Sequence, residues 1–141
     1  MVSKRRVLRE MVVKLFFQRE FRHNEFEEIF SETLNKIRDN TIKADFKRYV
    51  EGVFHNLSTI DNIISNHLIN WSFDRLSYLE RNVLRVGTYE LIYEENIPIE
   101  VTINEMIEIA KKYGSEESGK FVNGILDRIA KEHAPKEKFN L

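Results

Sequence analysis

The sequence predicts an all-α fold, with about seven helices in two small helical bundles packed as one domain. Apolar residues recur at the i, i+3, i+4, i+7 spacing of helices along almost the whole chain, and no segment alternates steadily between apolar and polar residues. Two prolines and five glycines leave few breaks in 141 residues. With 42% hydrophobic and 32% charged residues, the chain has the composition of a folded domain that buries a core.

The first helix is expected over roughly residues 3–22, and its core stripe consists of Leu8, Met11, Val12 and Leu15. A different side of the same helix carries Arg5, Arg6, Arg9, Val13 and Phe17. Basic and apolar side chains therefore share a side that the core stripe does not use. A partner could bind this side, or another helix of the chain could cover it.

Three more helices complete the first half. The second helix carries apolar residues from 26 to 37, and Asn24 with Glu27 three residues later resembles a capping box. The third covers residues 46–57 with the helical apolar spacing kept throughout. Ser58 and Asp61 are predicted caps of a fourth helix, which carries apolar residues from 60 to 68.

The second half is predicted to be built around the segment Leu79–Tyr93, which is apolar on nearly every side and so should be buried between other helices. Gly87 in its middle costs about 1 kcal/mol relative to Ala, which favours close approach of a neighbouring helix there. A sixth helix over residues 103–113 is expected to end at Gly114, and a seventh over 121–129 is expected to stop before Pro135.

We therefore expect a single domain over residues 1–141. Its N-terminal helical half spans about residues 1–70, its C-terminal helical half about 71–134, and a short tail 135–141. The two halves should meet near Trp71, the only tryptophan.

Composition also bears on the compartment. The chain has no cysteine, which excludes disulfides, thiol nucleophiles and cysteine-ligated metal sites. No apolar stretch approaches the roughly 18 residues of a membrane span, and the N-terminus lacks the apolar region of a signal peptide. We expect a cytoplasmic protein with no membrane partner.

Charge is distributed unevenly, although the net charge is only −1. Residues 1–24 contain seven basic and two acidic residues, a net +5, and the remaining 117 contain 15 basic and 21 acidic residues, a net −6. A basic arm on an acidic body is typical of a protein with a polyanionic partner.

Catalysis and metal binding find little support in the sequence. No nucleophile motif, phosphate-binding loop or dinucleotide fingerprint is present. Glu20 and His23 form a single ExxH, whereas a di-iron bundle needs two such pairs and two further glutamates. The other histidines, His55, His67 and His133, are scattered. We therefore predict no enzyme activity, no cofactor and no metal.

The basic cluster Lys4, Arg5, Arg6 and Arg9 is the strongest functional signal. Cations are disfavoured at a helix N-terminus, so their presence there indicates an external anion such as a phosphate backbone, or else a solvated end. If each cation neutralises one phosphate of a single strand, binding should fall with salt at a log–log slope of about −3.

A second signal is Asn123-Gly124, a turn dipeptide inside a helical pattern. A small residue there could let two helices touch. Alternatively, Asn123 and Phe121 could hydrogen-bond and stack with an unstacked base.

Taken together, several strings over some 120 residues resemble the NusB family of transcription antitermination factors. They are Lys-Arg-Arg…Arg-Glu at 4–10, Tyr-Val-Glu-Gly-Val at 49–53, Ile60-Asp61, Trp71, Asp74-Arg75-Leu76, Glu80-Arg-Asn-Val-Leu-Arg85, Tyr89-Glu90-Leu91, Ile97-Pro98, Ile103-Asn104-Glu105, Ala110-Lys-Lys-Tyr-Gly114 and Phe121-Val-Asn-Gly-Ile-Leu-Asp127. The resemblance implies a NusB-like fold. It also implies that the protein binds the single-stranded boxA segment of nascent ribosomal RNA operon transcripts together with a small ribosomal protein, NusE. Through other Nus factors this complex would contact RNA polymerase indirectly and help it read through terminators.

The resemblance also assigns site residues. Lys4, Arg5, Arg6 and Arg9 match the arginine-rich RNA-binding start of the family. The residues that match a second RNA-facing patch are Arg85, Glu117, Lys120 and Phe121. Phe17 and Glu80 match positions that face the ribosomal protein.

Two alternatives stay open on the sequence. One is the NusB-like N-terminal domain of a ribosomal RNA methyltransferase, which needs a further α/β domain to hold its methyl donor. The other is a purely protein-binding helical adaptor with a solvated basic arm. A homodimer that buries the arginine face is also compatible with the sequence, as is a monomer.

Overall fold

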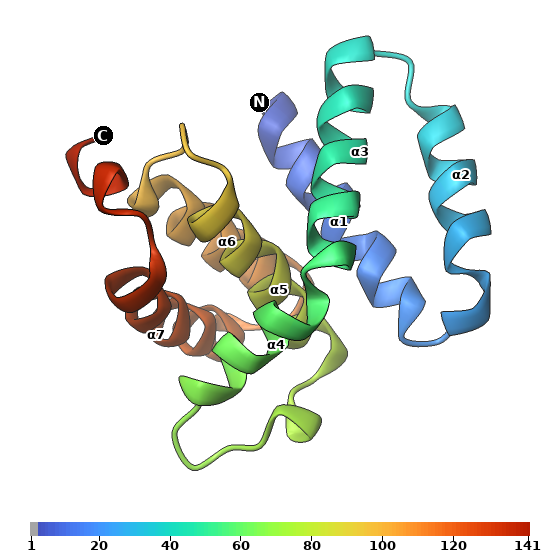
Figure 1. The fold of residues 1–141 in the computed structure, drawn as a ribbon. Helices are drawn as coiled ribbons and strands as arrows, with labels where there is room; N and C mark the ends of the chain where they lie inside the picture. Colours follow the sequence, from blue (N-terminus) through green and yellow to red (C-terminus); the bar gives the residue numbers. More distant parts are fainter. Residues whose placement is uncertain (1–2) are drawn as a thin grey trace.

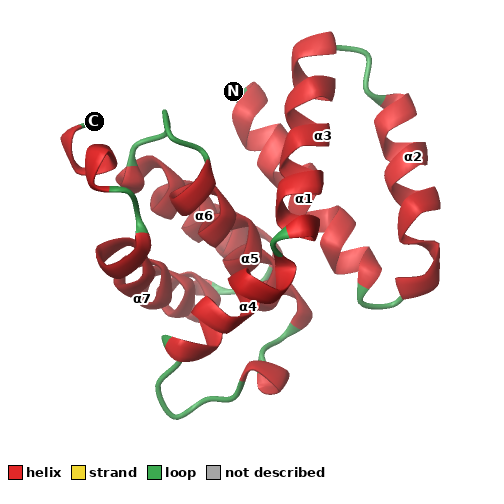
Figure 2. Ribbon diagram, viewed as in Figure 1, coloured by secondary structure: helices red, strands yellow, loops and turns green. Residues whose placement is uncertain are grey.

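The computed structural model describes residues 3–141 and confirms the all-α prediction (Figure 1). Within that range the chain forms seven α-helices and three short 3-10 helices joined by loops, without a strand (Figure 2). The α-helices are α1 (Lys4–Arg19), α2 (Phe26–Lys36), α3 (Asn40–His55), α4 (Leu57–Asn66), α5 (Tyr78–Tyr93), α6 (Ile99–Tyr113) and α7 (Glu116–His133). The 3-10 helices are His23–Glu25, Phe73–Arg75 and Lys136–Asn140. No helix of the described chain is long and apolar enough to cross a membrane.

Hydroxyl and carboxylate caps start the helices that position the site. Ser3 accepts a hydrogen bond from the backbone N–H of Arg6 and so caps α1, and Ser77 and Ser115 cap α5 and α7 in the same way. Asp39 caps α3, which therefore begins several residues earlier than the apolar pattern alone predicts.

The predicted caps of α2 and α4 are wrong, including Asp61, which lies inside α4. Asn24 lies in a 3-10 turn before α2, and α2 has no side-chain cap. Ser58 lies inside α4 rather than before it, because α4 follows α3 after the single residue Asn56. A polar residue next to an apolar run predicts a cap, but the chain enters both helices directly from a turn.

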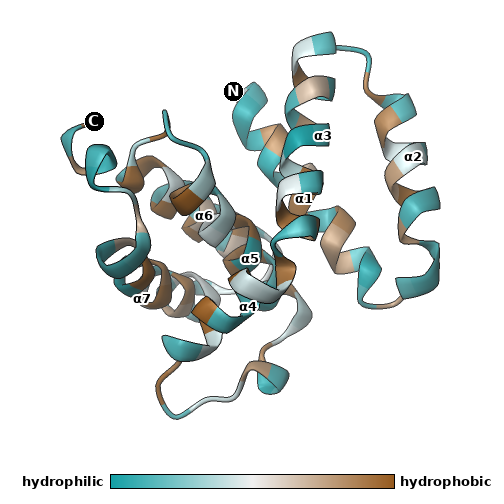
Figure 3. Ribbon diagram, in the orientation of Figure 1, coloured by the Kyte–Doolittle hydropathy of each residue, from teal (hydrophilic) through white to brown (hydrophobic). Residues whose placement is uncertain are grey.

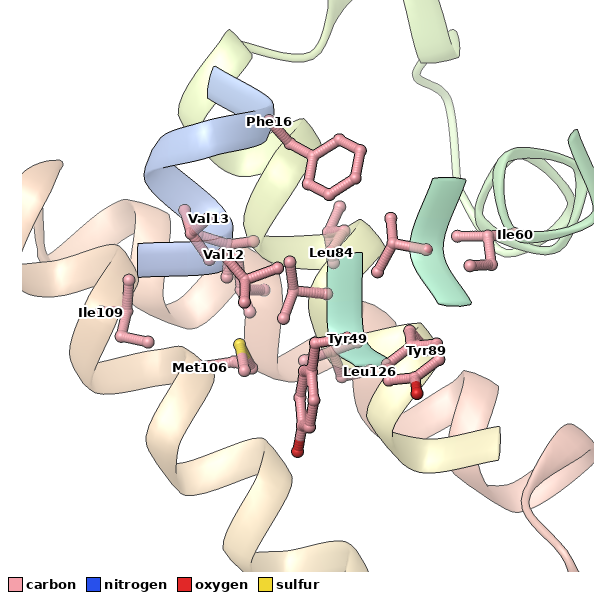
Figure 4. Close-up of a cluster of buried hydrophobic side chains, with 14 of the residues drawn as sticks. Val12, Val13, Phe16, Tyr49, Ile60, Leu84, Tyr89, Met106, Ile109 and Leu126 are labelled. Atoms are coloured by element: carbon pink, nitrogen blue, oxygen red, sulfur yellow. The ribbon is translucent and has the colours of Figure 1, made fainter. Parts of the chain in front are cut away.

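The core is organised around α5, which packs against α1, α3, α4, α6 and α7. Figure 3 shows apolar residues gathered where these helices face one another, and Figure 4 shows α1, α5, α6 and α7 side chains in contact at the centre. A Cβ on Gly87 would lie 2.9 Å from Leu126 Cδ1 and 3.1 Å from Met106 Cγ. The predicted close helix approach at Gly87 is confirmed.

The two predicted halves are joined through α5 rather than through Trp71. Helices α1, α3 and α4 all contact α5, whereas Trp71 lies in the loop before α5 with 48% of its surface exposed. The tail after α7 folds back onto α5, because Lys138 donates to the backbone carbonyls of Glu90 and Leu91. Burial lowers the pKa of Lys138.

The second side of α1 is only partly free. Val13 and Arg9 are each 2% exposed, so of the two alternatives for this side, a partner or another helix of the chain, the second holds for these two residues. Helix α5 packs against α1, and side chains of α6 bond Arg6 and Glu10 of α1, while Phe17, one turn after Val13, remains 37% exposed.

Candidate RNA and protein interface

The first two cations of the basic arm are exposed at the start of α1. Lys4 bonds Asp39 at 2.9 Å, but 77% of its side chain is accessible. Arg5 is exposed and has no ion pair with any described residue. Both are placed to meet an external anion.

Arg6 is held by an acid of α6. Its Nε and Nη2 donate to the two carboxylate oxygens of Glu105 at 2.6 and 2.5 Å. This hydrogen bonding raises the pKa of Arg6 and lowers the pKa of Glu105. A phosphate that binds Arg6 must therefore compete with a bidentate carboxylate.

Arg9 does not lie on the exposed basic face where the sequence analysis placed it. Its Nε lies 2.8 Å from Glu90 Oε2, and Glu90 is 0% exposed. The same carboxylate accepts from Tyr49 at 2.7 Å and from Thr102 at 2.6 Å. Burial lowers the pKa of Arg9, but the hydrogen bond and charge of Glu90 outweigh this, and the net pKa is raised. Burial, together with the charge of Glu90, raises the pKa of Tyr49 above its ordinary range.

Arg85, expected in the second RNA-facing patch, is also buried. It is 5% exposed and contacts both oxygens of Asp61 at 2.8 Å, and its Nη1 lies 3.1 Å from Glu20. Arg81 bonds the other Glu20 oxygen. The acids that hold Arg9 and Arg85 come from distant helices, and sequence spacing alone gave no sign of these pairs.

The rest of the second patch lies on α7. Glu117 and Lys120 expose 86% and 76% of their side chains, and Phe121 is half-buried against the core. Asn123 is exposed. A Cβ on Gly124 would meet only Arg128 Nη1, at 3.7 Å, so Gly124 does not mark a helix contact.

The predicted RNA-binding residues of the basic arm and of α7 lie on helices that both contact α6. Arg6 bonds Glu105 and Glu10 bonds Lys112, so α1 and α6 run in the same direction, and α7 begins just after α6 ends. The 16 residues of α1 span about 24 Å. An RNA strand that contacts both groups must therefore reach from the start of α1 to α7.

The positions expected to face a protein partner adjoin an apolar cavity of about 270 Å³ lined by Val13, Lys14, Phe17, Leu79 and Tyr113. Glu80 follows Leu79 and is half-buried, with no ion pair to any described residue, so it does not pair with Arg81 or Arg85.

Aromatic rings that the sequence analysis missed extend this surface. Phe21 is 66% exposed, and its ring lies 5.4 Å from that of Phe17 and 5.1 Å from that of Tyr78. We refer to Phe17, Phe21, Tyr78 and the cavity residues together as the aromatic surface. Contiguous exposed rings of this kind are typical of protein interfaces.

Comparison with known proteins places the chain among antitermination factors. Residues 6–131 match the model of the NusB family. The transcription antitermination protein NusB of Pseudothermotoga lettingae is 50% identical over 137 residues, which cover 97% of this chain and 98% of the relative.

Two solved structures share the fold. A NusB structure from Thermotoga maritima matches with a TM-score of 0.93 at 59% identity and covers 100% of both chains. A structure of antitermination factors NusB and NusE in complex with double-stranded RNA matches with a TM-score of 0.80 at 31% identity, over 94% of this chain and 100% of the other.

Proposed function

Because the chain belongs to the NusB family, we propose that it is a transcription antitermination factor. In this role it binds the boxA segment of nascent ribosomal RNA operon transcripts with the ribosomal protein NusE. The complex, with other Nus factors, then helps RNA polymerase read through terminators. The observation that carries the proposal is the match, over 94% of this chain, to a structure in which a NusB is bound to NusE and RNA.

We propose different roles for the predicted RNA-binding residues according to their exposure. Lys4, Arg5 and Lys120 are exposed cations that can neutralise phosphates, and Phe121 offers a partly exposed ring for a base. Arg6 can bind a phosphate if that phosphate replaces Glu105 as its hydrogen-bond acceptor. Glu117 lies beside Lys120, at 3.9 Å, and could accept from a base edge.

For the two buried arginines we propose a supporting role. Arg9 fixes α1 on α5 and α6, and Arg85 fixes α5 on α4. Each sets the position of the helices that present the exposed cations. Neither has a solvent-facing donor surface for a phosphate in this conformation.

The aromatic surface and Glu80 form the proposed NusE interface. The chain outside its first 24 residues has a net charge of −6, which complements a small basic ribosomal protein. The interface lies toward the end of α1 opposite the basic arm, so NusE and RNA can be bound together.

We further propose that the protein acts by binding and not by catalysis, in the cytoplasm, where nascent RNA and ribosomal proteins meet. The relative that shares 50% identity over 98% of its own length is named as an antitermination protein, which favours this function over a methyltransferase domain. Loss of RNA binding together with retained NusE binding would indicate the adaptor alternative.

The test is a reconstituted transcription assay. RNA polymerase, the other Nus factors and NusE transcribe a template with a boxA sequence upstream of a terminator. Addition of this protein should raise read-through on that template and leave a scrambled-boxA template unchanged. Equal read-through on both templates, or no effect on either, would contradict the proposal.

A further inference from the structure

Two histidines and a glutamate meet where the end of α4 contacts the end of α7. His67 is the residue that ends α4, and Glu132 and His133 are the last two residues of α7. Each offers one ligand atom, and these atoms lie within 4.8 Å of one another. The imidazole rings are 5.1 Å apart between centroids. The grouping joins parts of the chain 65 residues apart, and sequence analysis treated these histidines as unrelated.

The hydrogen bonds of His67 leave one nitrogen directed at this cluster. Its Nδ1 lies 2.7 Å from the backbone carbonyl of Ile63, and because a carbonyl only accepts, Nδ1 carries a hydrogen. In the neutral ring, Nε2 then presents a lone pair. That nitrogen lies 2.5 Å from Glu132 Oε2, which is also an acceptor. At this distance a proton lies between the two acceptors, and a metal ion can take its place when Glu132 moves back.

We propose that His67, Glu132 and His133 bind a divalent transition-metal ion of the Zn²⁺ class. Two imidazoles and one carboxylate suit Zn²⁺, Co²⁺ or Ni²⁺ and do not suit Mg²⁺ or Ca²⁺, which prefer oxygen ligands. The bond from His67 Nδ1 to a backbone carbonyl is the outer contact that orients metal-binding histidines. Three protein ligands leave a fourth position for water.

The exposure of the ligands permits binding. His67 has only 8% of its side chain exposed and is held by α4, whereas Glu132 is 67% exposed and free to adjust. Tetrahedral ligands about 2.1 Å from zinc are roughly 3.4 Å apart, so the carboxylate oxygen must move back by about 1 Å. The surface position of Glu132 makes that movement inexpensive.

Nearby charges limit the affinity without blocking the site. Arg128, one turn before Glu132, donates to the backbone carbonyl of His67 at 3.0 Å and does not bond a ligand atom. Lys131 is paired with Asp127 at 3.1 Å. A metal there would tie the last helix of the N-terminal half to the last helix of the domain and stabilise the folded chain by mass action.

The test uses the full chain after treatment with EDTA, titrated with ZnCl₂ by calorimetry, with MgCl₂ as the hard-ion comparison. The variants are His133→Ala and Glu132→Gln, and His55→Ala is the matched control because His55 is exposed on α3 and outside the cluster. We expect one Zn²⁺ per chain in the parent and in His55→Ala, and at least about tenfold weaker binding in both cluster variants, in line with loss of a ligand.

Thermal unfolding provides the second readout. In EDTA the cluster variants should unfold within a few degrees of the parent, and added Zn²⁺ should raise the Tm of the parent and of His55→Ala but not theirs. Zn²⁺ binding that is equal in parent and His133→Ala, or no binding in the parent, would overturn the proposal and leave a proton as the shared cation.

Discussion

Arg9 and Glu90 form an ion pair inside the core, with Arg9 Nε 2.8 Å from Glu90 Oε2 and side chains that are 2% and 0% exposed. Tyr49 and Thr102 donate to the same carboxylate, so side chains of α1, α3 and α6 all bond Glu90 of α5. Breaking a buried pair leaves an uncompensated charge, which costs far more than the pair contributes. One arginine of the basic arm therefore holds the helices together.

The first prediction concerns this pair. Arg9→Ala should lower the free energy of unfolding by about 3–5 kcal/mol, because Glu90 is left buried and unpaired. Arg5→Ala, four residues away at an exposed position, should change it by less than about 0.5 kcal/mol. Urea unfolding of both variants measures the difference. Similar stabilities would show that Arg9 is solvated.

The second prediction concerns the salt dependence of RNA binding. The basic arm contains four cations in the sequence. Among all the residues assigned to RNA, the exposed cations in the structure are Lys4, Arg5 and Lys120. Three single-strand phosphate contacts predict a log–log slope of about −2. Arg5→Ala and Lys120→Ala should each make the slope shallower by about 0.7. A slope near zero would remove these cations from the interface.

The third prediction is that Glu105 competes with RNA for Arg6. Glu105→Gln should raise RNA affinity at low salt by about threefold to fivefold, the equivalent of releasing one weak, half-buried ion pair. Glu108→Gln removes the same charge from the same helix. Glu108 acts on Arg6 through its charge but makes no hydrogen bond with it, and it pairs only loosely with Lys111, at 3.9 Å. Equal gains in both variants would indicate a general charge effect.

The fourth prediction separates the two interfaces. Glu80→Lys and Phe17→Ala should each weaken NusE binding by about tenfold, because one reverses a contact charge and the other removes an exposed ring from the aromatic surface. Direct RNA affinity should stay within about twofold of the parent. If RNA binding collapses while NusE binding is intact, the assignment of the two faces is wrong.

The fifth prediction concerns acid. Hydrogen bonding by Arg6 lowers the pKa of Glu105. A carboxyl whose folded pKa is depressed stabilises the fold above its unfolded pKa of about 4.3 and loses that contribution as pH falls through the folded value. Stability should therefore decline below about pH 4, and the decline should be shallower in Glu105→Gln. Unfolding free energies measured from pH 7 to pH 3 test this, and parallel profiles would contradict it.

Helix identities and the centre of the core followed from the sequence because they depend on local spacing. The all-round apolar pattern of Leu79–Tyr93 and the glycine at 87 led directly to α5 and its close contact with α6 and α7. Helix starts were less predictable, since Asn24 and Ser58 are capable caps that the chain does not use.

The burial of site residues was not predictable in the same way. Arg9 lies 81 residues from Glu90, and Arg85 lies 24 residues from Asp61. Charge counting assigned Arg9 to RNA and the family resemblance assigned Arg85, and neither shows burial, because the acidic partners of both arginines only become neighbours in the folded chain. The His67, Glu132 and His133 cluster escaped notice for the same reason.

Specific binding of boxA RNA together with NusE is tested most directly by fluorescence anisotropy. Labelled single-stranded boxA RNA is titrated with this protein, with and without NusE. A scrambled strand and a duplex of the same length serve as competitors. We expect boxA RNA to bind at least about tenfold more tightly than the scrambled strand when NusE is present. Equal affinity for boxA and scrambled RNA in the presence of NusE would contradict it.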